Sequence, residues 1–319
     1  MIMPAVSFYD QHPGQRSLKD EVLRGLARVP KAIPPKFFYD QQGSRLFDAI
    51  CDLPEYYLTR VETSILQRRA RELTELIDSQ CMLVELGSGA SKKVRLLLSA
   101  LKPTHYMGVD ISKDFLLESS RRLAQDYPWL EVHATCADFS SRLTLPEFLP
   151  PITKMAFFPG SSIGNFDPVQ AGRFLKQIAR MVGSGGYLLI GVDLKKDIDR
   201  LNAAYNDARG LTAAFNLNLL FRIREELDSQ IDPDGFEHLA FYNEAAGRIE
   251  MHLRSIKDQV VRIEDQNFRF EADETIHTEN SYKYTVEEFA ELGLSAGFNN
   301  DRVWTDAERL FSVHLMCVA

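Results

Sequence analysis

The stretch that decides the fold reads Val84-Glu85-Leu86-Gly87-Ser88-Gly89-Ala90-Ser91-Lys92-Lys93. The apolar residues before Gly87 predict a buried strand, and a helix is indicated after the turn because Val94, Leu97, Leu98 and Leu101 recur on one helical face. A strand, a glycine turn and a helix begin the nucleotide site of a doubly wound α/β sheet, since glycine lets the ligand approach and helix N–H groups face it. A lone Gly-x-Gly also occurs in purely structural turns, so this turn alone leaves both interpretations open.

The residues after the turn distinguish between cofactors. A dinucleotide fingerprint has a third glycine where this chain has Lys92, whose side chain would crowd a pyrophosphate. Asp110 ends the next apolar run and is placed to bind a ribose diol. Asp138 and Phe139 follow the third run and offer adenine a polar edge and an aromatic face. Any one of them is explained as an ordinary cap or surface residue, but together they favour S-adenosylmethionine over NAD.

Composition narrows the class of protein. The chain has 319 residues, of which 45% are hydrophobic and 26% charged, as in a globular protein of one large or two medium domains. A net charge of −8, without a basic cluster, argues against nucleic acid as a partner. No apolar run approaches ~18 residues, and no signal peptide is recognisable, so we expect no membrane contact.

The spacing of cysteine and histidine residues indicates whether a metal site is present and in which cellular compartment the protein works. The four cysteines are scattered, without Cys-x-x-Cys spacing, and no pair of histidines has the His-x-x-x-His spacing. We therefore expect reduced thiols, no metal site and a cytoplasmic location. We also expect the protein to be monomeric.

The alternation of strands and helices suggests how the chain is divided. It is clearest over residues 61–194, and it resumes at 285–319 with a capping box formed by Thr285 and Glu288. Between these segments, residues 197–227 are expected to be helical, and residues 249–253 alternate as in a half-buried strand. Residues 260–263 and 268–270 are expected to complete a small antiparallel meander. We therefore predict a cofactor-binding domain of residues 61–194 and 285–319, and a substrate-binding domain of residues 1–60 and 195–284.

The second domain is expected to position a methyl acceptor. Methyl transfer from a sulfonium is an in-line displacement, which needs a desolvated nucleophile about 3 Å from the methyl carbon and no metal. Candidate groups occur in the strings 37–40, 54–57, 160–165, 203–206 and 278–281. Each has a structural alternative: the tyrosines pack between domains, Asn165 forms a turn or caps the helix at Pro168, and Glu279 is a solvated strand residue.

The strings are specific enough to suggest a family. They include Phe38-Tyr39-Asp40, Leu53-Pro54-Glu55-Tyr56-Tyr57, Glu85-Leu86-Gly87-Ser88-Gly89 and Gly160-Ser161-Ser162-Ile163-Gly164-Asn165. From about residue 30 to the C-terminus, the chain resembles the histidine Nα-methyltransferases of ergothioneine biosynthesis. The resemblance implies a Rossmann-like class I methyltransferase sheet with an inserted α+β substrate-binding domain. It also implies S-adenosylmethionine-dependent Nα-trimethylation of L-histidine to hercynine, the first step of ergothioneine biosynthesis.

The resemblance also implies roles for individual residues. The residues matching the family's cofactor contacts are Gly87, Lys93, Asp110, Asp138 and Phe139. Those matching its histidine site are Tyr56, Gly160, Asn165, Tyr205, Met251, Glu279 and Ser281. Asn165 and Tyr205 are able to donate to the substrate carboxylate, and Glu279 and Ser281 to bond the two imidazole nitrogens. Tyr39 matches the phenol beside the reacting amine, where we expect it to orient the nitrogen lone pair as the catalytic residue.

Two other functions remain open at this point. One is an Nα-methyltransferase for another aromatic amino acid, although the resemblance implies that such relatives lose the acidic partner present here as Glu279. The other is a non-catalytic protein that binds S-adenosylmethionine. It predicts cofactor binding without turnover on any amine.

Overall fold

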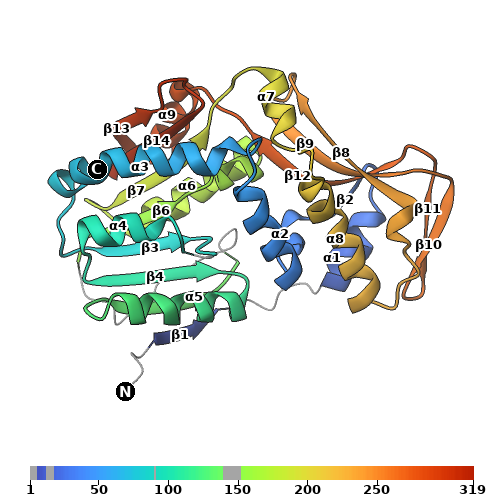
Figure 1. The fold of residues 1–319 in the computed structure, drawn as a ribbon, viewed down its shortest axis with the longest axis horizontal. Coiled ribbons are helices and arrows are strands. Elements are labelled where there is room, and N and C mark those ends of the chain that lie inside the picture. Colours follow the sequence, from blue (N-terminus) through green and yellow to red (C-terminus); the bar gives the residue numbers. More distant parts are fainter. Residues whose placement is uncertain (1–5, 12–17, 90, 139–151) are drawn as a thin grey trace. The chain divides into compact units, whose positions relative to one another are not determined.

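The computed structural model describes residues 6–11, 18–89, 91–138 and 152–319. The chain divides into two compact units, each assembled from segments far apart in the sequence (Figure 1). The first unit comprises residues 1–13, 58–195 and 283–319, and the second comprises residues 14–57 and 196–282. None of the helices in the described ranges is long and apolar enough to cross a membrane.

The first unit is built on an eight-stranded sheet with the order β1-β5-β4-β3-β6-β7-β14-β13. The strands from β1 to β7 in this order pair in parallel, and β14 is antiparallel to both of its neighbours. The strands are β1 (Val6–Asp10), β3 (Met82–Leu86), β4 (His105–Asp110), β5 (Glu131–Cys136), β6 (Lys154–Phe158), β7 (Tyr187–Asp193), β13 (Phe298–Thr305) and β14 (Phe311–Val318). This mainly parallel sheet confirms the predicted α/β, Rossmann-like fold class.

Helices pack on the sheet as their apolar periodicity predicts. Helix α5 contacts β4 and β5, α6 contacts β6 and β7, and α9 contacts β13. The helices of this unit are α3 (Tyr57–Leu76), α4 (Val94–Leu101), α5 (Lys113–Asp126), α6 (Pro168–Val182) and α9 (Val286–Ser295). The capping box expected at Thr285 and Glu288 opens α9. Because both of its hydrogen bonds are made, two otherwise unpaired backbone N–H groups of that helix are satisfied.

The second unit has a four-stranded sheet with the order β2-β12-β9-β8 and a separate hairpin, β10-β11. Its strands are β2 (Lys31–Ala32), β8 (Phe236–Asn243), β9 (Arg248–Ser255), β10 (Gln259–Ile263), β11 (Gln266–Phe270) and β12 (Thr275–Tyr282). Its helices are α1 (Leu18–Leu26), α2 (Gln41–Cys51), α7 (Ile198–Ala203) and α8 (Leu211–Glu226). Helix α8 contacts both β8 and β9. Ile249, Met251 and Leu253 are buried on one face of β9, as the alternation predicted. Glu250 and His252 on the other face are buried too, so the expectation of a half-buried strand is wrong for this part of β9.

The N-terminal segment differs from the prediction. We expected residues 1–60 to lie wholly in the substrate-binding domain, but β1 is an edge strand of the large sheet. It pairs in parallel with β5, so that Val6 and Phe8 pack against the core residues Leu116 and Ala134. Residues so distant in the sequence leave no local signal of their pairing.

Two local elements of the second unit also differ from the prediction. The expected helix over residues 197–227 is divided into α7 and α8, because the Asp207 carboxylate accepts from the N–H groups of Leu211 and Thr212 and starts a new helix after Gly210. The strands at 260–263 and 268–270 pair with each other in a two-stranded sheet of their own, rather than completing a meander with β9, and Ile263 also forms a single antiparallel bridge to Ser229.

Candidate active site

The glycine turn follows β3 and is held against the next strand. The N–H groups of Gly87 and Ser88 both donate to the carbonyl of Val109, at 2.8 and 3.1 Å. Gly87 and Gly89 have φ values of +69° and +48°, which glycine adopts without strain. Within 4 Å, and among the residues that the structure describes, a Cβ atom at Gly89 would meet only the Gly87 carbonyl, at 4.0 Å. The turn therefore leaves space on its outer side, as a nucleoside ligand requires.

Asp110 lies at the end of β4 and is joined to the turn. Its carboxylate accepts from the N–H of Gly89 and from the N–H of Ser112, both at 2.9 Å. Burial raises the pKa of Asp110, and the two backbone donors act against this rise by stabilising the charged form. The structure thus brings the predicted ribose acid and the glycine turn together.

The third cofactor string follows β5, whose neighbour in the sheet is β4. Asp138 is half-buried two residues after the end of this strand, and Phe139 lies outside the described residues. Because β3, β4 and β5 are parallel, their carboxyl ends meet at one edge of the sheet. Glycine turn, Asp110 and Asp138 consequently share the edge where α/β sheets bind ligands.

Lys93 is placed at this edge by a residue to which the sequence analysis assigned no role. The lysine precedes α4, and its ammonium forms an ion pair with the buried carboxylate of Glu62 on α3. The same carboxylate accepts from the N–H of Gly160, at 2.9 and 3.1 Å from its two oxygens. Glu62 thus joins one expected cofactor residue to one expected substrate residue. A signal was present in the sequence, because the string that begins at Leu53-Pro54-Glu55-Tyr56-Tyr57 continues as x-Thr59-Arg60-x-Glu62 in the resemblance to the family.

The loop that begins at Gly160 continues into a short 3-10 helix, Ser162–Asn165. Gly160 has a φ of +80°, and the Ser161 hydroxyl accepts from the N–H of Asp193 at 2.9 Å. Asn165 is half-buried at the end of this helix. The alternative that Asn165 caps α6 is wrong, because Asp167 caps it with a complete capping box.

In the second unit, aromatic rings connect three tyrosines of the predicted site. Tyr39 meets Phe47 edge to face at 5.7 Å between ring centroids, and Phe47 meets Tyr56 at 6.2 Å. Tyr56 in turn meets Tyr205 at 6.4 Å. Burial, and then the proximity of Tyr205 and other acidic groups, raises the pKa of Tyr56 well above its usual range. Tyr56 is therefore a neutral phenol and a hydrogen-bond donor at neutral pH.

The strands β9 and β12 bring the remaining substrate candidates to these tyrosines. The Tyr205 hydroxyl donates to the Ser281 hydroxyl at 2.8 Å, and both residues are buried. Glu279 pairs with Met251 across the two strands, directly after a bulge that follows His277. Glu279 is also one of the groups whose charge raises the pKa of Tyr56. A half-buried carboxylate, a serine hydroxyl and three phenols therefore lie together in one unit.

Two asparagines of α8 support this group and were missed in the sequence. Asn216 is fully buried, donates to the carbonyl of His252 at 2.9 Å and accepts from the Thr278 hydroxyl at 2.8 Å, next to Glu279. Asn218 donates at 3.0 Å to the carboxylate of Asp40, the residue that caps α2 and follows Tyr39. The sequence contained a signal for these residues, because an asparagine on the apolar face of a helix is expected to be buried and a buried amide requires hydrogen-bond partners.

The predicted site residues are thus distributed over both units. The first unit carries Gly87, Lys93, Asp110, Asp138, Gly160 and Asn165. The second carries Tyr39, Tyr56, Tyr205, Met251, Glu279 and Ser281.

Comparison with known proteins identifies the family. A family model described as "Histidine-specific methyltransferase, SAM-dependent" matches residues 18–318. The histidine N-alpha-methyltransferase of Mycobacterium tuberculosis is 39% identical over 95% of each chain, and that of Mycolicibacterium smegmatis is 38% identical over 99% of each. Ergothioneine biosynthesis protein 1 of Neurospora crassa is 34% identical over 90% of this chain, which spans 33% of that longer protein. The chain therefore belongs to the histidine-specific, S-adenosylmethionine-dependent methyltransferases.

Proposed function

We propose that this protein transfers three methyl groups from S-adenosylmethionine to the α-amino nitrogen of L-histidine, forming hercynine in the first step of ergothioneine biosynthesis. The glycine turn, Lys93, Asp110, Asp138 and Phe139 hold the cofactor in this proposal. Gly160, Asn165 and the residues of the second unit hold the amino acid.

The observation that carries the proposal is the position of Glu279 and Ser281 on β12. Both lie among the buried aromatic rings, and the Ser281 hydroxyl is oriented by its bond from Tyr205. An imidazole has one N–H donor and one acceptor nitrogen in its neutral form. A carboxylate accepts from the first, and a serine hydroxyl donates to the second. A phenol or an indole offers no such pair, which favours histidine over tyrosine or tryptophan.

The residues of the chain position the reacting amine and shape its surroundings in this reaction. S-adenosylmethionine supplies an electrophilic methyl group on its sulfonium. The protein must present the amine with its lone pair free and must exclude water. Tyr56 remains protonated and serves as a donor, because its pKa is raised. We assign Tyr39 to orienting the α-amino nitrogen, with the proton of each round leaving through water. The aromatic rings near the nitrogen stabilise the growing positive charge through cation–π contacts.

Replacing Glu279 with alanine tests the assignment of substrate. Loss of a hydrogen bond to a charged group costs about 1.5–3 kcal/mol, which corresponds to a roughly 10- to 100-fold higher KM for histidine. Affinity for S-adenosylhomocysteine, measured by calorimetry, is expected to remain at the wild-type value. Glu237→Ala is the matched control, because Glu237 is an exposed acid on β8 of the same sheet. Its kinetics are expected to match the wild type.

A competition assay over the aromatic amino acids completes the test. Mass spectrometry counts one, two or three methyl groups on histidine, tyrosine and tryptophan supplied together. We expect trimethylated histidine alone. Methylation of tyrosine or tryptophan without histidine would establish the alternative substrate, and cofactor binding without any methylated product would establish a non-catalytic binding protein.

We further propose that the protein acts as a cytoplasmic monomer on free histidine, without a membrane or nucleic-acid partner. The acidic net charge of −8 supports the last point. Light scattering after size-exclusion chromatography is expected to give the mass of one chain.

A further inference from the structure

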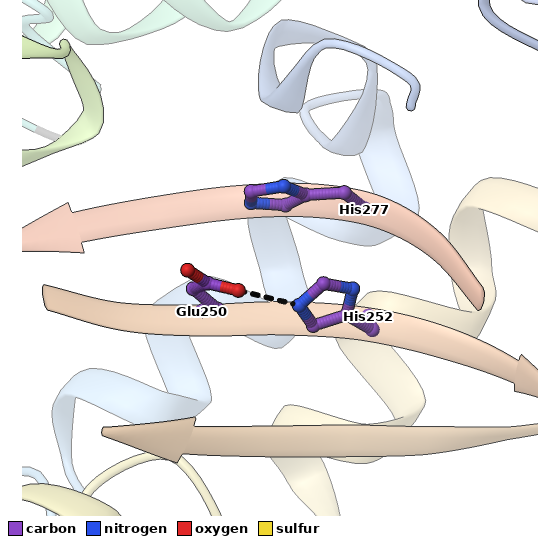
Figure 2. Close-up of side chains that lie close together, drawn as sticks. All are labelled: Glu250, His252 and His277. Carbon is purple, nitrogen blue, oxygen red and sulfur yellow. Dashed lines mark hydrogen bonds and ion pairs between the residues drawn. The ribbon is translucent and has the colours of Figure 1, made fainter. Parts of the chain in front are cut away.

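Glu250, His252 and His277 form a group of side chains outside the proposed histidine site (Figure 2). Glu250 and His252 are two residues apart on β9, and His277 is paired with His252 on β12. Side chains alternate between the faces of a strand, so this group lies on the face opposite Met251. The sheet therefore carries substrate candidates on one face and a carboxylate with two imidazoles on the other.

The distances within the group approach those of ligands to one metal ion. One potential ligand atom from each residue lies within 4.8 Å of the other two. Glu250 Oε2 and His252 Nε2 are 3.0 Å apart, and the two imidazole rings are 4.6 Å apart between centroids. Bonds of about 2.0–2.2 Å from zinc to nitrogen and oxygen place two ligand atoms about 3–4 Å apart. The Glu250–His252 pair already has this spacing, and a ligand atom of the half-buried His277 lies within 4.8 Å of both.

The chemistry of the three side chains suits a divalent transition-metal ion. The group offers one carboxylate oxygen and two imidazole nitrogens, which are the oxygen and nitrogen ligands that zinc binds in proteins.

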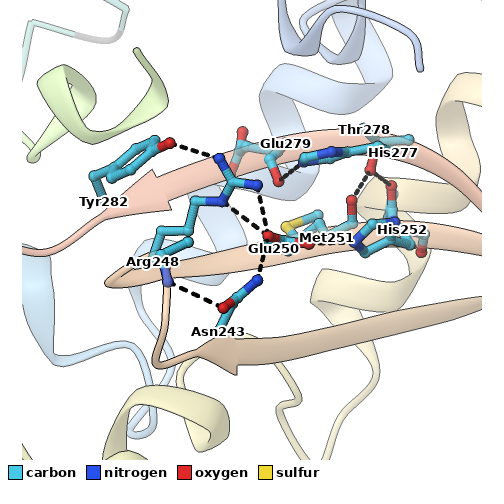
Figure 3. Close-up of polar contacts among 11 residues, drawn as sticks. Asn243, Arg248, Glu250, Met251, His252, His277, Thr278, Glu279 and Tyr282 are labelled. Atoms are coloured by element: carbon cyan, nitrogen blue, oxygen red, sulfur yellow. Dashed lines mark hydrogen bonds and ion pairs between the residues drawn. The ribbon is translucent and has the colours of Figure 1, made fainter. Parts of the chain in front are cut away.

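Neighbouring residues orient these ligands from outside (Figure 3). Arg248 and Asn243 donate to Oε1 of Glu250 at 2.6–2.9 Å, which leaves Oε2 directed at His252. The ring of His277 donates through Nε2 to the carbonyl of Glu279 at 3.1 Å, so its Nδ1 carries the lone pair. Metal-binding histidines characteristically make such a bond with the nitrogen that does not face the metal.

Asn280 is the residue paired with Glu250 across the strands, so its side chain lies on the same face as the three candidate ligands. Its amide also interacts with the ring of His277. The amide oxygen of Asn280 is therefore placed to act as a fourth ligand.

We propose that Glu250, His252 and His277 bind one divalent transition-metal ion such as Zn²⁺, with Asn280 Oδ1 or water as the fourth ligand. The ion ties β9 to β12 at the bulge that precedes Glu279. The absence of His-x-x-x-His spacing led us to expect no metal, but strand pairing brings together residues 25 positions apart. Binding of the ion does not depend on the proposed methyl transfer, so the two proposals fail separately.

The test uses the purified full chain after removal of metals with a chelator. Titration with Zn²⁺ in competition with a chromophoric chelator is expected to show one ion per chain. His252→Gln and His277→Gln are expected to lower the affinity at least 100-fold. The matched control is His105→Gln, because His105 and His133 on β4 and β5 also face a carboxylate, that of Glu131, but their rings are 6.0 Å apart. Its zinc affinity is expected to equal that of the wild type.

Two outcomes would overturn the proposal: no saturable Zn²⁺ binding by the wild type, or loss of binding in His105→Gln with retention in His277→Gln. Binding of S-adenosylhomocysteine monitors whether each variant is folded. If both glutamine variants fail to fold, a crystal of the wild-type chain grown with Zn²⁺ decides. An anomalous difference map from data collected at the zinc absorption edge is then expected to show a peak between Glu250, His252 and His277. If the map shows peaks only at other positions, the assignment is contradicted.

Discussion

Replacing Glu62 with glutamine or alanine should destabilise the first unit and weaken its hold on the cofactor. The carboxylate is fully buried on α3, where it pairs with Lys93 and accepts from the N–H of Gly160. Gly191 leaves room for it, since a Cβ atom there would stand 2.0 Å from Glu62 Oε1. The Glu62 carboxylate therefore occupies the space that a side chain at position 191 of β7 would fill.

The expected magnitude follows from these contacts. The side chain of Lys93 is 17% exposed, so removal of Glu62 leaves a largely buried ammonium without its counter-ion. Breaking such a pair costs about 3–5 kcal/mol, which we expect for Glu62→Ala. Glu62→Gln keeps an oxygen for the Gly160 N–H and loses only the charge, so we expect about 1.5–3 kcal/mol. If Lys93 contacts the cofactor as proposed, the Kd of S-adenosylhomocysteine rises about tenfold, or about 1.4 kcal/mol.

Urea unfolding measures the first effect, and calorimetric titration with S-adenosylhomocysteine measures the second. Glu75→Gln is the control, because Glu75 is an exposed acid on the same helix, and its effect is expected to stay within about 0.5 kcal/mol. If Glu62→Gln unfolds at the wild-type urea concentration and binds the cofactor analogue equally well, the buried charge has no role in placing Lys93 or Gly160.

Three further substitutions test other parts of the first unit. Asp110→Ala is expected to weaken S-adenosylhomocysteine binding while the circular dichroism stays unchanged, and an unaltered Kd would exclude a ribose contact. Burial lowers the pKa of His314 to about 4, below the ordinary value of about 6.5, so the unfolded chain binds the extra proton first as the pH falls. The free energy of unfolding should therefore drop by about 3 kcal/mol between pH 6.5 and 4, and urea titrations of His314→Gln should lack this part of the drop. Lys283→Met is expected to cost about 3–5 kcal/mol, because Lys283 and Asp193 form a fully buried ion pair at 2.7 Å. Adding Asp193→Leu should recover part of that loss, and a double variant as unstable as the single one would contradict the pairing.

Much of the cofactor edge was predictable because its signals are local. The turn at Gly87, the helix that begins at Val94 and the capping box at Thr285 each depend on residues a few positions apart. The strand ends at Asp110 and Asp138 follow from the same alternation. Parallel pairing then places the carboxyl ends at one edge, so that the fold class implies the relation between these residues.

The candidate substrate residues Tyr56, Tyr205 and Glu279 were identified by the resemblance to the family and not by local patterns. Periodicity marked Tyr56, Tyr205 and Glu279 as ordinary packing or surface residues, and only the family strings assigned them to a substrate. Their contacts with one another depend on the pairing of β9 with β12 and on the buried amide of Asn216. A bulge shifts the register just before Glu279, and no propensity of single residues indicates where such a bulge lies.

By itself, the sequence determined the α/β class, the strand–turn–helix at Gly87–Gly89 and the family, since each depends on patterns within short stretches. Only the tertiary structure decided that β1 joins the large sheet, that Glu62 joins Lys93 to Gly160, and that His277 meets Glu250 and His252. The physical reason is the range of the interactions. Helix periodicity and capping act over a few residues, whereas strand pairing and the burial of charge depend on which distant segments meet when the chain folds.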